Sequence, residues 1–147
     1  MKYRGLFKQL FIVSIFLLMI NSCKKTAPQA AVPYVNVNFP IYLNLNTYNK
    51  LNVPGNWIYV TGGDKGIIIY RYDQSTFSIW DRCCTYNALS ADAYVSVESN
   101  NVYAIDSSCG SVFNILNGQV QHGPATLPLK GYNYTFDPTS NTLNVYN

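Results

Sequence analysis

The chain has 147 residues, enough for one domain with a hydrophobic core and too few for two domains of ordinary size. Its formal net charge of +3 comes entirely from Lys2, Arg4 and Lys8, because the seven other basic residues equal the seven acidic ones in number. This balance excludes the broad basic surface of a nucleic-acid-binding protein.

The first 33 residues have the pattern of an export and anchoring segment. Three cations precede the apolar run LFIVSIFLLMI (residues 10–20), which is shorter than a membrane span and typical of a signal peptide. The run ends in NSC, which resembles a bacterial lipobox, so we expect residues 1–22 to form a lipoprotein signal peptide and Cys23 to be acylated. Residues 23–33 then form a lipidated tether. The prediction is an exported lipoprotein on a bacterial membrane, at the outer membrane, its periplasmic face or the cell surface; the alternative is a short membrane anchor with an incidental cysteine.

The pattern of residues 34–147 predicts one all-β domain of small antiparallel sheets. Apolar residues alternate with asparagine in VNVNFPIYLNLN (residues 35–46), which predicts two strands separated at Pro40. Eight later segments, separated by turn sequences, have the same short, strand-like pattern: NWIYV, GIIIYRY, FSIWD, YVSVES, NVYAI, SVFNI, YNYTF and TLNVYN. The best helix candidate, NALSADA (residues 87–93), is barely two turns long.

Three cysteines lie in this domain: Cys83, Cys84 and Cys109. An odd number in an oxidising compartment predicts one disulfide and one free thiol. A ring closed across one peptide bond strains both the disulfide and the peptide, so we expect one of the two adjacent cysteines to bond to Cys109.

The segment around Cys109, SCGSVFNILNGQVQHGPATLPLKGY, resembles the second half of the Rieske iron–sulfur domain. That family has Cys-x-x-His-Gly-Ser-x-Phe-Asp, then Gly-x-Val, Gly-Pro-Ala, Pro-Leu and Tyr. The matching positions are Gly110, Ser111, Phe113, Gly118, Val120, Gly123, Pro124, Ala125, Pro128, Leu129 and Tyr132, and Asn114 replaces the Asp. FSIWDRCCTYN is similar to the strand that leads into the family's first ligand loop. The resemblance covers residues 34–147 and implies a Rieske-like domain with an inserted two-loop subdomain at about residues 82–127.

Carried over by this resemblance, the four cluster-ligand positions are Cys84, Tyr86, Asp106 and Cys109. A Rieske centre needs two thiolates on one iron and two imidazoles on the other. A phenol and a carboxylate do not replace a neutral imidazole or a soft thiolate. We therefore expect no ordinary [2Fe-2S] cluster and no metal; the alternatives are a [2Fe-2S] cluster with atypical ligands, or another iron or zinc site.

The only histidine, His122, is expected in an exposed turn. An alternative joins it with Cys83, Cys84 and Cys109 as four ligands for zinc or iron, although side chains that alternate along a strand do not easily face one metal together. If Cys84 keeps the orientation that the resemblance implies, Cys83 points into the domain as a small apolar side chain. Cys84 and Cys109 then face each other and form the disulfide.

Four functions are compatible with these patterns. The leading hypothesis is a lipid-anchored Rieske-like domain that has lost its cluster and serves as a binding or structural module for an unknown protein partner. The alternatives are a Rieske-type electron-transfer lipoprotein with atypical ligands and a thiol–disulfide protein that uses Cys84 and Cys109, although no Cys-x-x-Cys motif is present to lower a thiol pKa. Exposed tyrosines as a sugar-binding platform remain a minority interpretation. No enzyme is expected, because one histidine and no paired carboxylates offer no catalytic set, so the chain is at most an electron-transfer subunit.

Overall fold

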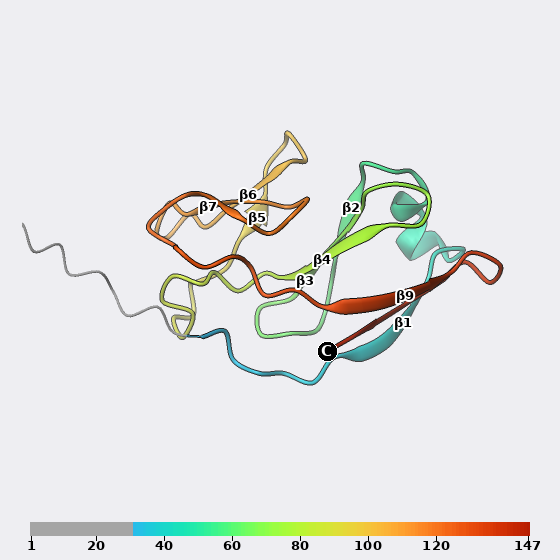
Figure 1. The fold of residues 1–147 in the computed structure, drawn as a ribbon, viewed down its shortest axis with the longest axis horizontal. Helices are drawn as coiled ribbons and strands as arrows, with labels where there is room; N and C mark the ends of the chain where they lie inside the picture. The colour runs from blue at the N-terminus through green and yellow to red at the C-terminus, as the bar shows by residue number, and fades with distance from the viewer. Residues whose placement is uncertain (1–30) are drawn as a thin grey trace, which may run out of the picture.

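The computed structural model describes residues 31–147, and the predicted signal peptide and the acylated Cys23 lie outside the described residues. This part of the chain contains ten strands and one short 3₁₀ helix, η2 (Asn46–Asn52) (Figure 1). The strands are β1 (Asn38–Tyr42), β2 (Trp57–Val60), β3 (Ile67–Arg71), β4 (Phe77–Asp81), β5 (Ser96–Val97), β6 (Tyr103–Ile105), β7 (Val112–Asn114), β8 (Val120–His122), β9 (Asn133–Asp137) and β10 (Thr142–Tyr146). No helix within residues 31–147 has the length and apolar character needed to cross a membrane.

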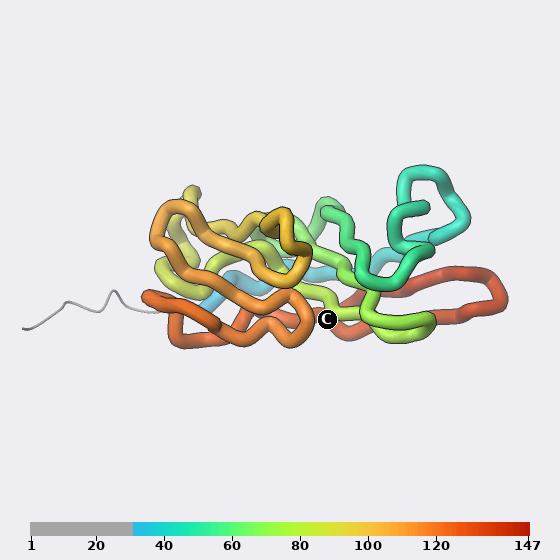
Figure 2. The backbone as a smooth tube through the Cα atoms, turned by 90° about the horizontal axis from the view of Figure 1, so that it is seen from above, coloured from blue at the N-terminus to red at the C-terminus, as the bar shows by residue number. Residues whose placement is uncertain are grey.

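The strands form three small antiparallel sheets with the orders β1-β10-β9, β2-β3-β4 and β5-β6-β7-β8. The last sheet is inserted in the chain between β4 and β9, as the sequence predicts for a two-loop subdomain. Figures 1 and 2 show an elongated molecule with β5–β8 at one end and η2 and the β9–β10 turn at the other. The predicted fold class, an all-β domain of small antiparallel sheets, is confirmed.

Strand β3 is the centre of the fold because all five of its residues are buried. Successive side chains of a strand point to opposite faces, so β3 contributes to two cores. Ile67 and Ile69 pack into a core shared with the β1-β10-β9 sheet, whereas Ile68 and Tyr70 pack into a core shared with the inserted sheet. The strand therefore joins the inserted sheet to the rest of the domain.

Strand β1 corrects the expectation of two strands separated at Pro40. Residues 38–42 form one strand, in which Pro40 lies opposite Asn144 of β10. β1 is an edge strand, and an edge strand pairs on one side only, so it tolerates a residue that has no N–H to donate.

Three further local differences involve short elements. Residues 87–93 form successive turns, closed by Ser90 N–H to Asn87 O (2.8 Å) and Ala93 N–H to Ser90 O (3.2 Å), and contain no helix. The helix that does form, η2, follows the first strand and was not predicted. Strand β8 was also not predicted, because it has only three residues and two of them are exposed. Elements of this length carry too few residues to establish a period.

Candidate functional site

The first loop of the site begins at Asp81, the last residue of β4, whose carboxylate is fully buried. Its Oδ2 accepts hydrogen bonds from the Asp64 N–H (2.7 Å) and the Tyr132 hydroxyl (2.7 Å). Its Oδ1 accepts from the N–H groups of Cys83 (2.8 Å) and Lys65 (3.3 Å). Four donors from three parts of the chain therefore fix the point at which the loop leaves the strand.

The two adjacent cysteines that follow are both fully buried but have different surroundings. Cys83 forms an isolated antiparallel bridge with Tyr94, and its thiol lies 3.5 Å from the carbonyl oxygen of Ala88. The Cys84 N–H donates to the carbonyl of Ala93 (3.0 Å), and its side chain belongs to the core beneath the inserted sheet. The structure thus places Cys83 inside the domain, as the sequence predicts, and leaves Cys84 to face the second loop.

The second loop is a tight turn that follows β6. The Asp106 N–H donates to Ser111 O (2.9 Å), and the Gly110 N–H donates to Asp106 O (2.7 Å). Gly110 has a φ of +79°, a left-handed conformation that glycine adopts without strain. The turn brings the side chains of Asp106 and Cys109 together.

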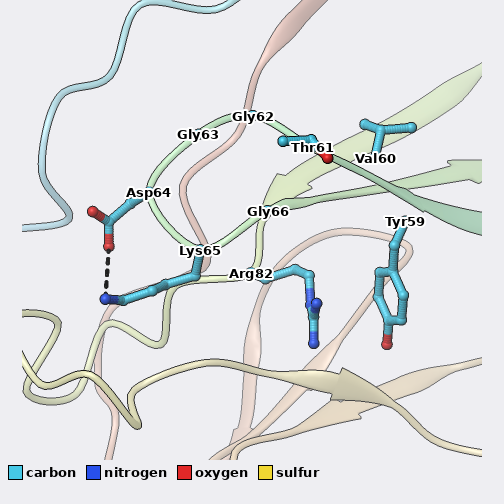
Figure 3. Close-up of a pocket in the computed structure, with 9 residues that line it drawn as sticks. All are labelled: Tyr59, Val60, Thr61, Gly62, Gly63, Asp64, Lys65, Gly66 and Arg82. Carbon is cyan, nitrogen blue, oxygen red and sulfur yellow. Dashed lines mark ion pairs between the residues drawn. The ribbon is translucent and has the colours of Figure 1, made fainter.

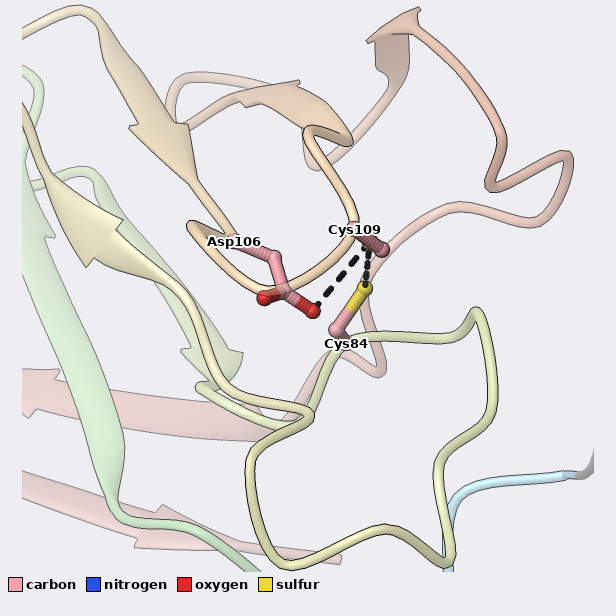
Figure 4. Close-up of side chains that lie close together, drawn as sticks. All are labelled: Cys84, Asp106 and Cys109. Atoms are coloured by element: carbon pink, nitrogen blue, oxygen red, sulfur yellow. Dashed lines mark hydrogen bonds between the residues drawn. The ribbon is translucent and has the colours of Figure 1, made fainter.

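Cys84, Asp106 and Cys109 form one compact group (Figure 4). Their donor atoms all lie within 4.8 Å of one another. The two sulfur atoms are 3.8 Å apart, and the Cys109 thiol lies 3.3 Å from Asp106 Oδ2. Cys84 and Asp106 are buried, whereas Cys109 is partly exposed. The predicted cysteine pair therefore meets; both thiols are free in the structure, and the disulfide stays a prediction.

Burial and neighbouring acidic groups determine the protonation of this group. Burial, together with the hydrogen bond to Asp106 and the nearby Cys109, raises the pKa of Cys84 well above the ordinary thiol value. Burial acts to raise the pKa of Asp106 as well, but hydrogen bonds from Ser108, Cys84 and Cys109 outweigh it and hold that pKa below the usual carboxyl value. At neutral pH the free site therefore holds a Cys84 thiol beside a carboxylate.

Three other predicted site residues lie outside this group. Burial, with a smaller contribution from the hydrogen bond to Asp64, raises the pKa of Cys83 to about 12. This thiol is therefore inert. Tyr86 packs against the core beneath the inserted sheet, and His122 is exposed on β8. The one group of three or more potential ligands within residues 31–147 includes none of these three, so the structure does not assemble the alternative site of three cysteines and His122.

The donor set does not fit a Rieske [2Fe-2S] centre. Such a centre takes two thiolates and two imidazoles. Cys84 and Cys109 supply two sulfurs and Asp106 supplies a carboxylate, but no imidazole belongs to the group. A cluster held by four cysteines is excluded too, since residues 31–147 contain three and Cys83 points away from the group.

Two serines support the site, and sequence reasoning missed their roles. The Ser108 N–H (2.8 Å) and hydroxyl (2.6 Å) both donate to Asp106 Oδ1. The Ser111 hydroxyl oxygen is buried, accepts a hydrogen bond from the Ala125 N–H (2.9 Å) and lies 3.1 Å from the Cys109 sulfur. The spacing Asp-x-Ser is the one available signal, because an aspartate commonly bonds to the backbone two residues ahead.

A separate pocket of about 480 Å³ lies beside the TGGDKG turn (residues 61–66) and Arg82 (Figure 3). Its charged groups have partners in ion-pair or ring contacts, although Asp64 Oδ2 is buried and accepts no hydrogen bond from the described residues. Asp64 and Lys65 form an ion pair of 3.7 Å, and the Arg82 guanidinium stacks on Tyr59 at 4.1 Å and donates to Val95 O at 3.0 Å. We therefore place the candidate site at Cys84, Asp106 and Cys109.

No protein-family model matches the chain, and no curated protein matches it. Among solved structures, it is similar to the ferredoxin of carbazole 1,9a-dioxygenase from Nocardioides aromaticivorans IC177 (13% identity, TM-score 0.44, 64% of this chain and 86% of that chain). It is also similar to the Sphingomonas yanoikuyae B1 ferredoxin (14%, TM-score 0.46, 67% and 93%). A complex of reduced oxygenase and oxidized ferredoxin in carbazole 1,9a-dioxygenase contains a third similar chain (20%, TM-score 0.44, 63% and 82%). Likenesses this distant assign no activity to the chain.

Proposed function

We propose that the chain is a lipid-anchored Rieske-like domain that carries no [2Fe-2S] cluster and serves as a binding or structural module. The observation that supports this most directly is the donor set of Cys84, Asp106 and Cys109, which has two sulfurs and no imidazole. Hydrogen bonds within and between the loops around these residues hold the three side chains together. The domain acts through a partner protein rather than by catalysis.

The competing function is electron transfer by a Rieske-type centre with atypical ligands. Iron analysis, visible absorption and the electron paramagnetic resonance spectrum of the reduced full chain test it. We expect a colourless protein with no iron signal. A triple variant, Tyr86→His, Asp106→Cys and Cys109→His, restores the family's ligand types at all four positions and is the positive control for cluster assembly under the same expression conditions. A reduced-state iron–sulfur signal from the unmodified chain would overturn the proposal.

Anchoring through Cys23 supports a role at a membrane surface. Ala31 and Val32, the first described residues, line a small pocket with Thr85 and Leu127 of the two-loop end. Cys23 lies eight residues before Ala31, so acyl chains on it would be at most about 29 Å along the chain from these loops. The loops would therefore lie at the membrane-proximal end of the domain.

Replacement of the acylated cysteine tests the anchor. We expect the full chain to be recovered in the membrane fraction and the Cys23→Ser variant in the soluble fraction of the exported protein. Cys83→Ser, which alters a thiol buried in the domain, is the control and should remain with the membrane. Membrane recovery of Cys23→Ser equal to that of the unmodified chain would exclude lipid anchoring at this residue.

Thiol–disulfide chemistry is a second candidate, because the sulfurs of Cys84 and Cys109 lie 3.8 Å apart. A reactive thiol has a lowered pKa, whereas that of Cys84 is raised. A structural cross-link is therefore favoured over catalytic exchange. A measured reduction potential below about −300 mV supports a structural bond, and a value near −200 mV supports exchange.

A further inference from the structure

We propose that Cys84, Asp106 and Cys109, when reduced, bind one zinc ion through two sulfurs and one carboxylate oxygen. This inference rests on the proposed absence of a cluster, because a cluster would occupy the same thiolates. The proposed zinc site differs from a [2Fe-2S] centre because it holds one ion, uses three protein donors and needs no histidine.

The spacing of the donor atoms fits a single tetrahedral zinc ion. With Zn–S bonds of about 2.3 Å and a Zn–O bond of about 2.0 Å, tetrahedral angles place two sulfurs about 3.8 Å apart and a sulfur and an oxygen about 3.5 Å apart. The Cys84 and Cys109 sulfurs are 3.8 Å apart, and Cys109 Sγ lies 3.3 Å from Asp106 Oδ2. Two of the three donor–donor distances therefore match a tetrahedral zinc ion to within a few tenths of an ångström, and all three donor atoms lie within 4.8 Å of one another.

The charge of the group also favours a cation. Asp106 is 1% exposed, yet within the described residues no lysine or arginine forms an ion pair with it. A buried carboxylate without a cationic partner is costly, and the cost grows when neighbouring thiols ionise. Zinc binding releases the two thiol protons to solvent, and the divalent ion then offsets two of the three negative charges of the carboxylate and the thiolates.

The neighbours of the three ligands hold them in place. Ser108 binds Asp106 Oδ1 with two hydrogen bonds, and the carboxylate's other oxygen, Oδ2, is the one that faces the sulfurs. Ser111 lies against the Cys109 sulfur and is itself held by the Ala125 N–H. Such partners orient metal ligands and raise affinity.

The fourth coordination position is open. A pocket of about 210 Å³ borders Cys109 and is lined also by Tyr86, Ser90, Asp92 and Ser108. Zinc sites with three protein ligands keep a fourth position for water or an incoming donor group. Cys109 is the least buried member of the group, so this position would lie toward the pocket.

Metal titration of the full chain tests the proposal. The protein carries Cys23→Ser, is reduced with a phosphine, freed of metal and titrated with zinc in competition with a chromophoric chelator; cobalt(II) provides an optical probe of thiolate ligation. We expect one zinc per chain and sulfur-to-cobalt charge-transfer absorption. Asp106→Asn removes a ligand and should weaken zinc binding by about 100-fold or more. Loss of a residue that only hydrogen-bonds to a ligand costs up to about 100-fold, and loss of the ligand itself should cost at least as much.

Matched controls separate the site from general effects on folding. Cys84→Ser should abolish the cobalt charge-transfer band, and Cys83→Ser should keep it, although Cys83 is the adjacent residue. Asp137→Asn is the control for Asp106→Asn, because Asp137 also accepts hydrogen bonds within a turn but lies outside the group. Circular dichroism establishes that each metal-free variant is folded.

A second readout is independent of affinity. Oxidised glutathione converts the two thiols to a disulfide: the pair loses two electrons and two protons, and one oxidised glutathione is reduced to two glutathione molecules. We expect zinc to slow this reaction at least tenfold in the Cys23→Ser chain. At the same zinc concentration, zinc should have no effect on the rate in the Asp106→Asn variant of that chain. A chain that binds no zinc, or a Cys83→Ser variant that loses zinc as Cys84→Ser does, would overturn the zinc site and leave the proposed loss of the cluster standing.

Discussion

Asp81 is the residue that holds the first loop and the neighbouring turn in place. Its buried carboxylate accepts hydrogen bonds from Asp64, Lys65, Cys83 and Tyr132. The same carboxylate explains Gly63: a Cβ there would lie 2.3 Å from Asp81 Oδ2, and the glycine has a φ of +63°. The Asp preceding the cysteine pair is therefore a structural residue.

Replacement of Asp81 should destabilise the domain strongly. Asp81→Ala leaves several buried donors without an acceptor, and each such group costs about 1–3 kcal/mol. We expect a loss of at least about 3 kcal/mol in the free energy of unfolding, measured with urea on the reduced chain. Tyr132→Phe, which removes one of the four donors and leaves the carboxylate, is the control and should cost about 1–2 kcal/mol. Equal losses for the two variants would show that the backbone bonds to Asp81 contribute nothing.

The free energy of unfolding should fall at acid pH as Asp106 is protonated and loses the hydrogen bonds that its carboxylate accepts. Its pKa is lower in the folded chain than the ordinary value of about 3.9, so the stabilising contribution is fully present above that value and is lost as the pH falls through the folded pKa. The groups that face it are Ser108, Cys84 and Cys109, and burial raises the pKa of the Cys84 thiol far above the acid range.

The measurement compares the metal-free parent with Asp106→Asn between pH 6 and pH 2. The parent should be more stable at pH 6, and the difference between the two unfolding free energies should shrink as the pH falls below about 4. Exposed Asp73 and Asp137 also have lowered pKa values, but they are common to both proteins and cancel in the comparison. A difference that stays constant over this range would contradict the assignment.

At the scale of elements, β4 carries the inserted sheet. The Trp80 indole N–H donates to Ile115 O (2.7 Å), and the Ser78 hydroxyl donates to Leu116 O (2.7 Å). The turn between β7 and β8 contacts the same indole, since a Cβ on Gly118 would lie 2.8 Å from Trp80 Cζ3. The position of the second ligand loop therefore depends on contacts made by β4.

Two glycine substitutions separate this contact from backbone strain. Gly118→Ala meets a left-handed φ of +70° and the Trp80 ring, whereas Gly55→Ala meets a φ of +84° and open space. The left-handed conformation alone costs about 1–2 kcal/mol, and forcing atoms into a packed contact costs about 1–3 kcal/mol more. Urea unfolding should therefore show a larger loss for Gly118→Ala than for Gly55→Ala. Equal losses would mean that the indole moves aside freely.

The longer strands could be predicted from the sequence because alternating or continuous apolar residues mark them. Strand β1 was misjudged at Pro40, since tolerance of proline depends on the strand's place at a sheet edge, which pairing alone decides. The helix η2 and strand β8 carry no such signal. Helix η2 has one buried residue, Leu51, which packs into the core, and β8 forms by pairing with the neighbouring strand β7.

At the scale of the whole molecule, motif positions predict some of the residues that meet at the site, and the fold decides which of them are brought together. The meeting of Cys84 and Cys109 follows from the resemblance of the two loops to cluster-binding loops. The same resemblance places Asp106 and Tyr86 at ligand positions, but the fold brings only Asp106 into the group, through the turn that Gly110 and Ser111 close, whereas Tyr86 packs against the core. His122 is near Cys109 in sequence but outside the group in space.

Oxidation should stabilise the molecule as a whole, because the Cys84–Cys109 bond would join the first loop to the inserted sheet. The two residues are 25 positions apart, and a closed loop of that size is worth roughly 3 kcal/mol by its entropy in the unfolded chain. Metal-free chain treated with oxidised glutathione should exceed the reduced chain by this amount in urea unfolding. Cys83→Ser should keep the gain and Cys84→Ser should lose it, since the Cys83 sulfur lies against the Ala88 carbonyl, away from Cys109. Peptide mapping that pairs Cys83 with Cys109 would contradict the arrangement of the two loops.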